Sequence, residues 1–429
     1  MTDHQPTSLS LQAPKSGLLA LLQTTVTYSF NNTTFYQEHL KKHIDENITI
    51  NSIEDFQKLP FTTKDNVTQS FPFGMLATPI EQVIAYYESS GTTNNNFNGS
   101  SKIPSFLTRN DLNLDVKRRL MNKIEVTESD VILNSLPFAY TSCGLAFQLA
   151  FQSKNAMLIA CNSDQTYKNF LKQSDISKYL RPTILLTPHP FSYALLNEKL
   201  ATDQLKSIVL CGIPTSENAK KKASLMFNNA DVHDVYGLSE FGAITYSCQN
   251  KNKHIIAKDF YIEIINPQTG KPCQDKEFGE IVITTLTREA SPKIRYRTGD
   301  WGRVISNNCC SNSSPTLEIK GRLKEAIMIN KSRIFPTDIE NIICRIPESN
   351  GIYKIKYNPQ KRKLIIHLEA QTNIRKRSAI KLELISLMRE FFDLKFSIKI
   401  SSPRALYPKF ISKNLGTNLK LFKNFKLTG

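Results

Sequence analysis

The sequence predicts an α/β protein with two domains. Residues 1–320 form a large N-terminal domain of helix-covered, largely parallel sheets with a small β-rich portion, and residues 321–429 form a small mobile α+β C-terminal domain. Apolar runs of strand length that alternate with helical stretches predict the parallel sheet. From Phe260 the chain changes to strands joined by turns, and after Gly321 a compact order of strands and helices indicates the second domain.

The N-terminal segment predicts helices. Apolar residues recur at helical spacing over 17–42, with a break at 31–32. Ser52 is a suitable N-cap for a helix that ends before Pro60, and Thr63 is a second N-cap.

The predicted strands of the parallel sheet are short and apolar, and helical segments such as 167–179 and 217–227 lie between them. These strands are 130–136, 156–160, 183–187, 207–210 and 232–235. The later segments 260–265 and 279–285 are typical of strands joined by a turn.

The C-terminal domain is predicted in the order strand, helix, strand, strand, helix, strand. Its elements are 325–329, 336–346, 351–357, 363–369, 374–392 and 395–400. Gly321 and Arg322 stand at its beginning, so we expect a hinge near 321–324.

Composition bounds the class of protein. Hydrophobic residues make up 40% of the 429 residues, which excludes full disorder. No apolar run approaches the roughly 20 residues that span a bilayer, and the first residues do not resemble a secretory signal. We therefore expect a cytoplasmic protein without a membrane partner, whose eight cysteines do not form a disulfide framework.

The net charge of +17 is concentrated at the C-terminal end, where residues 351–429 hold 18 Lys or Arg against 4 Asp or Glu. Such a segment attracts anions, although a solvated lysine-rich surface is equally compatible with it. Nucleic acid is not an expected partner, because aromatic residues do not alternate with the basic ones as in a stacking platform.

One candidate phosphate-binding loop follows the strand-like run 83–87. It contains Ser89, Ser90, Gly91, Thr92 and Thr93, whose backbone N–H groups and hydroxyls can surround phosphate oxygens. By itself this loop is also compatible with an exposed turn.

Two further segments carry groups that suit a nucleotide. After the strand 232–235 come Tyr236, which can stack on a purine, and Glu240, whose carboxylate can hold Mg²⁺. Asp300 follows another strand-like run and can accept hydrogen bonds from a ribose diol. Each of these residues is also compatible with an ordinary turn.

In this order and spacing the segments resemble the serial motifs of the adenylate-forming superfamily, which includes acyl-CoA synthetases, peptide-synthetase adenylation domains and luciferases. The chain is most similar to the phenylacetate–CoA ligase branch, through segments between residues 20 and 415. Those segments are 53–65, 71–75, 236–240, 284–290, 294–300 and 335–336. The resemblance implies an enzyme that binds ATP and Mg²⁺, forms an acyl-AMP from a small carboxylic acid, and passes the acyl group to coenzyme A.

The resemblance also implies roles for single residues. The nucleotide-binding positions are Ser89, Ser90, Gly91, Thr92 and Thr93 for the triphosphate, Gly212 beside the adenine, Tyr236 and Gly237 for the adenine face, and Asp300 for the ribose. Glu240 is expected to hold Mg²⁺, and Arg322 follows the hinge glycine. Lys413 is the candidate for the lysine that neutralises charge at the α-phosphate, with Lys409 as the alternate.

An apolar acid pocket is expected near the Glu240 turn. Its members are Phe138, Tyr140, Phe241, Gly242 and Ala243, which suit an aryl or arylacetic acid. Each of them is also compatible with a place in the core.

Part of the branch carries a structural zinc site, and Cys248 and His254 match its first pair of ligands. The second pair is the contiguous Cys309 and Cys310, whose side chains are expected to be strained as joint tetrahedral ligands.

Three departures from the family pattern favour adenylation over thioester formation. No lysine follows Thr93 until Lys102, Lys331 stands where a glycine lets the backbone approach pantetheine, and Ser412 replaces a glycine in the tail. The alternatives are therefore a stand-alone adenylation enzyme that loads a pantetheinylated carrier protein or forms an amide, and a degenerate nucleotide-binding relative. A homodimer stays open.

Overall fold

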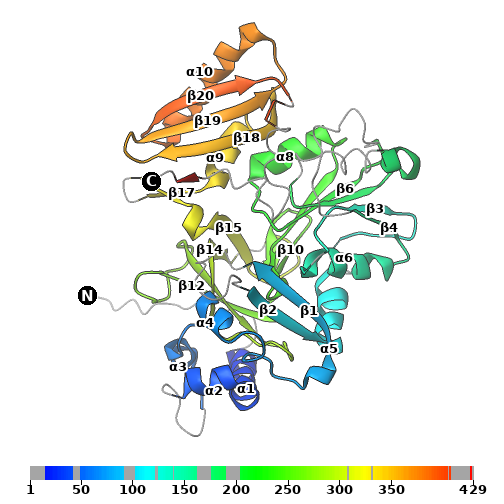
Figure 1. The fold of residues 1–429 in the computed structure, drawn as a ribbon, viewed down its shortest axis with the longest axis vertical. Coiled ribbons are helices and arrows are strands. Elements are labelled where there is room, and N and C mark those ends of the chain that lie inside the picture. The colour runs from blue at the N-terminus through cyan, green and yellow to red at the C-terminus, as the bar shows by residue number, and fades with distance from the viewer. Residues whose placement is uncertain are drawn as a thin grey trace. The chain divides into compact units, whose positions relative to one another are not determined.

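The computed structural model describes residues 15–41, 49–90, 102–120, 124–138, 140–161, 175–189, 203–306, 309–329, 332–403, 405–406 and 426–427. The chain divides into two compact units (Figure 1). Unit 1 comprises Met1–Val126, Phe138–Asn155 and Asp234–Ile319, and unit 2 comprises Thr127–Pro137, Ala156–His233 and Lys320–Gly429. The predicted division into 1–320 and a separate mobile domain of 321–429 stays a prediction.

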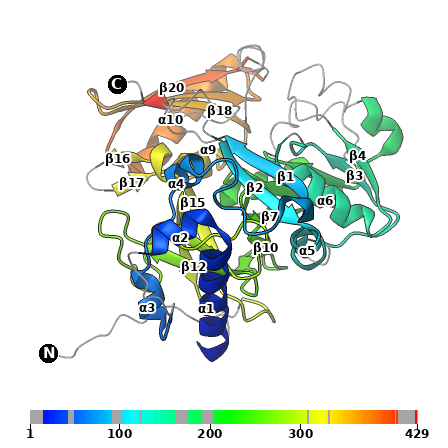
Figure 2. The same cartoon turned by 60° about the horizontal axis from the view of Figure 1, so that its bottom comes forward.

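Unit 1 begins with four helices. They are α1 (Lys15–Asn32), α2 (Thr34–Leu40), α3 (Ile53–Lys58) and α4 (Lys64–Gln69). The predicted break is confirmed, because Thr33 caps α2 by accepting a hydrogen bond from the backbone N–H of Tyr36. Ser52 and Thr63 cap α3 and α4 as predicted. Figure 2 shows α1, α2 and α3 grouped together, and their buried side chains pack against Tyr261.

A β-hairpin and several helical segments follow in unit 1. After a short 3₁₀ turn, η1 (Ile80–Gln82), strand β1 (Val83–Ser90) pairs antiparallel with β2 (Lys102–Thr108). The next helical elements are α5 (Arg109–Asn113), the π-helix η2 (Leu114–Leu120) and α6 (Ser142–Gln152). Thr108 begins α5 through a capping box with Asp111.

A six-stranded sheet forms the β-rich portion of unit 1. Its order is β10-β11-β15-β14-β13-β12. The strands are β10 (Thr245–Ser247), β11 (Lys253–Ile255), β12 (Phe260–Ile265), β13 (Gly279–Thr285), β14 (Tyr296–Ile305) and β15 (Thr316–Arg322), whose last three residues belong to unit 2. β13 is buried along its whole length, whereas β14 alternates buried and half-buried residues. The two-residue strands β8 (Gly237–Leu238) and β9 (Gly242–Ala243) form a tight hairpin beside this sheet.

Unit 2 contains the predicted parallel sheet, in the order β4-β3-β5-β6-β7, except for the last two residues of β7, which belong to unit 1. Its strands are β3 (Val131–Asn134), β4 (Met157–Ala160), β5 (Ile184–Thr187), β6 (Ser207–Cys211) and β7 (Asp231–Val235). All five lie where the apolar runs predict them, and β5 and β6 are buried throughout because apolar side chains cover both faces. The helix predicted at 217–227 is α8 (Glu217–Met226), whereas much of the helix predicted at 167–179 lies outside the described residues.

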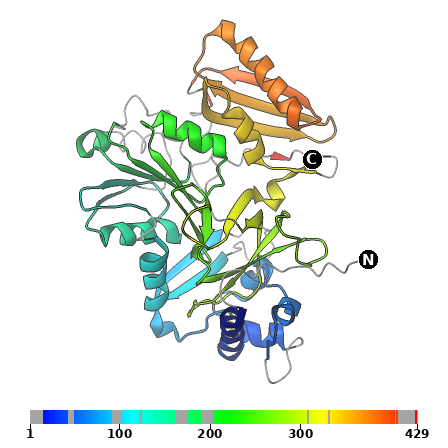
Figure 3. The same cartoon turned by 180° about the vertical axis from the view of Figure 1, so that it is seen from behind.

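The C-terminal part of unit 2 has the six elements predicted, in the predicted order, and two short strands that were not predicted, β17 and β21. It comprises β16 (Ile327–Ile329), β17 (Ser332–Ile334), α9 (Pro336–Ile343), β18 (Ser349–Asn358), β19 (Lys363–Ala370), α10 (Ile374–Phe391), β20 (Lys395–Ser401) and β21 (Lys426–Leu427). Figure 3 shows α10 along one face of the sheet β20-β19-β18-β21. The apolar side chains of α9 and α10 form one core with β18, β19 and β20.

The structure bears on two expectations from the sequence, the lack of a disulfide framework and the lack of a membrane-spanning segment. All eight cysteines lie within the described residues and are free thiols, so the expectation of no disulfide framework is confirmed. Within the part of the chain that the structure describes, no helix has the length and apolarity that a bilayer crossing needs.

Candidate active site

Glu240 lies in the turn between β8 and β9, and its carboxylate is held by two hydroxyl groups. Ser89 Oγ donates to Oε1 at 3.1 Å, and the phenol of Tyr296 donates to the same oxygen at 3.0 Å. The Glu240 side chain is buried, with 4% of its surface exposed. Ser89 is near the end of β1 and Tyr296 begins β14, so three separate parts of unit 1 meet at this carboxylate.

A second pair of predicted site residues, Tyr236 and Asp300, is joined by a hydrogen bond further along β14. The phenol of Tyr236 donates to Asp300 Oδ2 at 2.7 Å, and the Asp300 backbone N–H donates to Thr298 Oγ1 at 3.0 Å. Asp300 and Tyr296 lie on the same strand, and Tyr236 and Glu240 lie on the same hairpin. The structure therefore brings Ser89, Tyr236, Glu240 and Asp300 into one region of unit 1.

The β8–β9 hairpin is tight enough to require glycine. A Cβ atom on Gly237 would lie 2.7 Å from the carbonyl oxygen of Gly242. Any residue larger than glycine would therefore clash with the opposite strand. Gly242 itself has a positive φ of 73°. The two glycines thus allow Glu240 to project from a turn whose strands are in direct contact.

A buried lysine lies near this site. Lys293 is fully buried, and its ammonium donates to the backbone carbonyl of Ser291 at 3.3 Å. Burial lowers the pKa of Lys293 to about 8, although the attraction of Glu240 acts in the opposite direction. Its burial could not be predicted from the sequence, because a lysine in a loop is ordinarily solvated.

The predicted acid-pocket residues have very different exposures. Phe241 is fully buried and packs edge-on against Tyr296, with ring centroids 5.4 Å apart. Ala243 is buried as well, whereas Tyr140 is 66% exposed and has a positive φ of 58°. Phe138 is partly buried. A common apolar pocket formed by these residues stays a prediction.

Cys248, His254, Cys309 and Cys310 form a compact cluster in unit 1. Their ligand atoms all lie within 4.8 Å of one another. His254 Nε2 is 3.2 Å from Cys309 Sγ and 3.3 Å from Cys310 Sγ, and the Sγ atoms of Cys248 and Cys309 are 3.8 Å apart. The contiguous cysteines therefore both face the histidine, and the strain expected of them as joint tetrahedral ligands stays a prediction.

Some predicted residues lie in unit 2. Gly212 follows β6 with a φ of 102°, in the kind of turn that ends a parallel strand. Arg322 ends β15, directly after Gly321, whose φ is 141°. Gly91, Thr92, Thr93, Lys409 and Lys413 lie outside the described residues, and the side chain of Ser90 is not described either.

Tyr296 was not predicted to act at this site, although it lies in the segment 294–300 and alternates with polar residues along β14 in the buried positions. Arg119 and Arg288 were not predicted either, because a buried arginine cannot be distinguished from a surface arginine in a single sequence.

Comparisons with known proteins agree with these motifs. A family model described as "AMP-binding enzyme" matches residues 108–287. The phenylacetate-coenzyme A ligase of Aromatoleum evansii is 28% identical over 343 residues, which cover 77% of this chain and 75% of that protein. The phenylacetate-coenzyme A ligase of Pseudomonas putida is 27% identical over 361 residues, which cover 81% of this chain and 79% of that protein.

A solved structure has the same fold. The crystal structure of 2-hydroxyisobutyryl-CoA ligase in the postadenylation state, in complex with 2-HIB-AMP, gives a TM-score of 0.80 at 17% identity and covers 91% of this chain and 86% of that chain. The family match, the relatives and the shared fold make the chain similar to adenylate-forming, AMP-binding enzymes. Within this class the chain is similar to the phenylacetate–CoA ligases, the branch that its motifs indicate.

Proposed function

We propose that the protein activates a carboxylic acid with ATP as an acyl-AMP and then transfers the acyl group to the thiol of coenzyme A. The observation that carries the proposal is two hydrogen-bonded pairs in one region of unit 1, Ser89 with Glu240 and Tyr236 with Asp300. Tyr296, on the same strand as Asp300, also donates to Glu240. These four residue types are what a nucleotide with its metal ion requires.

The first half-reaction is a substitution at phosphorus. A carboxylate oxygen of the acid forms a bond to the α-phosphorus of ATP, the bond to pyrophosphate breaks, and acyl-AMP results. Tyr236 stacks on the adenine, and Asp300 accepts hydrogen bonds from the ribose hydroxyls. Ser89 and Ser90 end strand β1 and are not part of a loop as predicted; together with Gly91, Thr92 and Thr93 they bind the triphosphate. Lys413, with Lys409 as the alternate, supplies the positive charge at the α-phosphate.

Glu240 is the proposed ligand of Mg²⁺. Its Oε2 accepts no hydrogen bond from the described residues, while Oε1 accepts two from neutral hydroxyls. A carboxylate oxygen in this state fits a hard divalent cation, which prefers oxygen ligands. When bound, Mg²⁺ neutralises charge that develops on the phosphate oxygens.

In the second half-reaction the coenzyme A thiol attacks the acyl carbon, a C–S bond forms, and AMP leaves with the bonding electron pair. Rotation of a C-terminal domain about the segment 321–324 exchanges the groups that face the acyl-AMP, and Arg322 acts beside the nucleotide. The curated relatives named phenylacetate-coenzyme A ligase support coenzyme A as the acceptor and an aryl or arylacetic acid as the substrate.

The alternative acceptor is the pantetheine thiol of a carrier protein. Residues 351–429 contain 18 Lys or Arg and only 4 Asp or Glu. This positive charge favours an acidic partner such as a carrier protein.

We also propose a structural Zn²⁺ at Cys248, His254, Cys309 and Cys310. Tetrahedral zinc with Zn–S bonds of about 2.3 Å requires sulfur atoms about 3.8 Å apart, and the Cys248–Cys309 separation is 3.8 Å. His254 Nδ1 lies 2.6 Å from the carbonyl oxygen of Ser314, so Nδ1 carries the proton and Nε2 has its lone pair available for the metal. The donor set therefore fits zinc, whose role there is to hold this edge of the sheet.

The test is acid-dependent ATP–pyrophosphate exchange across a library of carboxylic acids, followed by incubation with coenzyme A. Exchange with an aryl or arylacetic acid and formation of its CoA thioester are expected. Exchange without thioester would favour the carrier-protein or amide alternative. ATP binding without exchange on any acid would refute the proposed activity and indicate a degenerate relative.

A further inference from the structure

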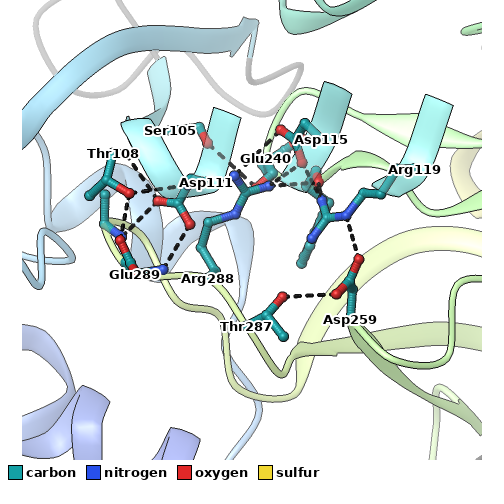
Figure 4. A network of polar contacts seen from close by, with 12 residues as sticks. Ser105, Thr108, Asp111, Asp115, Arg119, Glu240, Asp259, Thr287, Arg288 and Glu289 are labelled. Carbon is teal, nitrogen blue, oxygen red and sulfur yellow. Dashed lines mark hydrogen bonds and ion pairs between the residues drawn. The ribbon is translucent and has the colours of Figure 1, made fainter. Parts of the chain in front are cut away.

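Two buried arginines converge on the residue that follows Glu240. Arg119 Nη1 and Arg288 Nη2 each donate a hydrogen bond of 2.8 Å to the backbone carbonyl oxygen of Phe241. Figure 4 shows the two arginines beside Glu240 and Asp115. Arg119 is 1% exposed and Arg288 is 5% exposed. Both acceptor directions of this single carbonyl are therefore occupied by cationic donors, which make the stronger class of hydrogen bond.

Two buried carboxylates balance these charges. Asp115 Oδ1 accepts from Arg119 Nη1 and lies 3.4 Å from Arg288 Nη2, and Arg119 Nε donates to Asp259 Oδ2 at 2.8 Å. A buried ion costs several kcal/mol unless it is paired in good geometry. The ion pairs offset the free-energy cost of burying these charges. Hydrogen bonding of a single turn carbonyl does not by itself require them, because a water molecule could donate to it instead.

The loop that carries Arg288 is itself fixed. The Asp111 carboxylate accepts hydrogen bonds from the backbone N–H groups of Glu289 at 2.9 Å and Ala290 at 3.0 Å. Glu289 in turn accepts a 2.6 Å hydrogen bond from Thr108 Oγ1. Arg288 therefore reaches Phe241 from a backbone whose own position is determined by the start of α5 (Figure 4).

The Glu240 turn is held at both ends. The backbone N–H of Phe241 donates to the carbonyl of Leu238 at 3.0 Å, and its carbonyl is held by the arginines. On the far side, a Cβ atom on Gly242 would lie 3.0 Å from Asp115 Oδ2, so the turn already packs against this carboxylate. Glu240 is the residue between these fixed points.

We propose that Arg119, Arg288 and Asp115 are positioning residues of the adenylation site, which hold the Glu240 turn so that its carboxylate stays directed at the divalent cation. This inference rests on the proposed function of Glu240. A purely structural role predicts that loss of Arg288 changes only the folded fraction. A positioning role predicts weaker metal binding by the protein that remains folded.

The test compares Arg288→Met, Arg288→Lys and a matched control, Arg295→Met. Arg295 is equally buried and is paired with Glu263 at 2.9 Å, but none of its hydrogen bonds reaches the Glu240 turn. Two readouts are taken: Mn²⁺ binding in the presence of ATP by electron paramagnetic resonance, and the Mg²⁺ concentration that half-saturates pyrophosphate exchange. Thermal unfolding is followed for every variant.

We expect Arg288→Met to raise both metal constants about 10-fold, with kcat at saturating Mg²⁺ changed much less. Arg288→Lys should recover part of the loss, because lysine keeps the charge but not the planar pair of donors. Arg295→Met should lower Tm and leave both metal constants unchanged. If Arg288→Met does not fold, Arg288→Lys and Asp115→Asn carry the same comparison.

Metal constants in the folded Arg288 variants that equal those of the wild type would overturn the inference. The wild type could also bind Mn²⁺ with ATP more tightly than the variants and yet catalyse no exchange. That result would refute the proposed reaction and would still support the positioning role. A wild type that binds no Mn²⁺ with ATP would remove both.

Discussion

Replacement of Glu240 by glutamine separates the metal site from the fold. In the wild type, the hydroxyl oxygens of Ser89 and Tyr296 lie 3.1 Å and 3.0 Å from the Glu240 carboxylate oxygen. Glutamine has the same shape, so its Oε1 can still accept both hydrogen bonds. Each of these two hydrogen bonds weakens by about 1 kcal/mol when the acceptor loses its charge. The cost of burying a charge disappears at the same time. The free energy of unfolding should therefore change by less than about 2 kcal/mol.

The effect on activity should be much larger. The amide cannot serve as an anionic ligand, and loss of one preorganised electrostatic contact to a phosphoryl transition state typically reduces the rate by about 10²–10³. Pyrophosphate exchange at saturating acid and ATP should fall by that factor. Higher Mg²⁺ concentrations should restore only part of it.

Glu263→Gln is the matched control. Glu263 is buried to the same extent, 4% exposed, but its carboxylate is paired with Arg295 through hydrogen bonds of 3.1 Å and 2.9 Å. Breaking a buried ion pair costs about 3–5 kcal/mol, which lowers Tm by roughly 6–20 °C for a unit of this size. Exchange per folded molecule should be unchanged.

The assay is isotope exchange into ATP together with thermal unfolding of wild type and both variants. The expected result is a double dissociation: Glu240→Gln loses activity and keeps stability, and Glu263→Gln loses stability and keeps activity. Undiminished exchange in Glu240→Gln at limiting Mg²⁺ would refute the assignment of this carboxylate.

Three further predictions concern other buried groups. Cys248→Ser or His254→Ala should reduce bound zinc from one per chain to none by elemental analysis, and a zinc content that does not change would contradict the proposed site. Lys293→Met should raise stability at pH 7 by up to about 3 kcal/mol, because burial lowers the pKa of Lys293 from 10.5 to about 8 and the unfolded chain then binds its proton more tightly. That difference should shrink as the pH rises from 8 toward 10.5, and denaturant unfolding at pH 7 and pH 9.5 would reveal a constant difference if the reasoning is wrong. Tyr87→Phe should leave stability unchanged or raise it by about 1 kcal/mol, since the buried Tyr87 hydroxyl has no hydrogen-bond partner among the described residues; a lowered Tm would indicate a partner.

Local features of the chain were predictable because neighbours in sequence decide them. The caps at Ser52 and Thr63 depend on backbone N–H groups three residues away, and the structure confirms both. The strands of the parallel sheet follow from apolar runs such as 183–187, since a strand covered on both faces must be apolar throughout.

The motifs of the site were predictable by resemblance, but their contacts were not. The resemblance indicated Ser89, Tyr236, Glu240 and Asp300 as residues of one site. It did not predict which of them are joined by hydrogen bonds. Phe241 was compatible with an acid pocket or with the core, and the structure adds that its side chain is fully buried against Tyr296. A side chain's exposure depends on which strands and helices cover it, and one sequence does not contain that information.

The sequence by itself determined where most helices and strands begin and end, and it indicated candidate site residues by their order and spacing. Only the tertiary structure decided which of those residues meet: Ser89 reaches Glu240 across 151 positions and Arg119 reaches Asp259 across 140. It also decided that Cys309 and Cys310 both face His254. The physical reason is that a capping bond or an apolar period is set within a few residues, whereas a contact between distant strands depends on sheet order, register and burial of the whole unit.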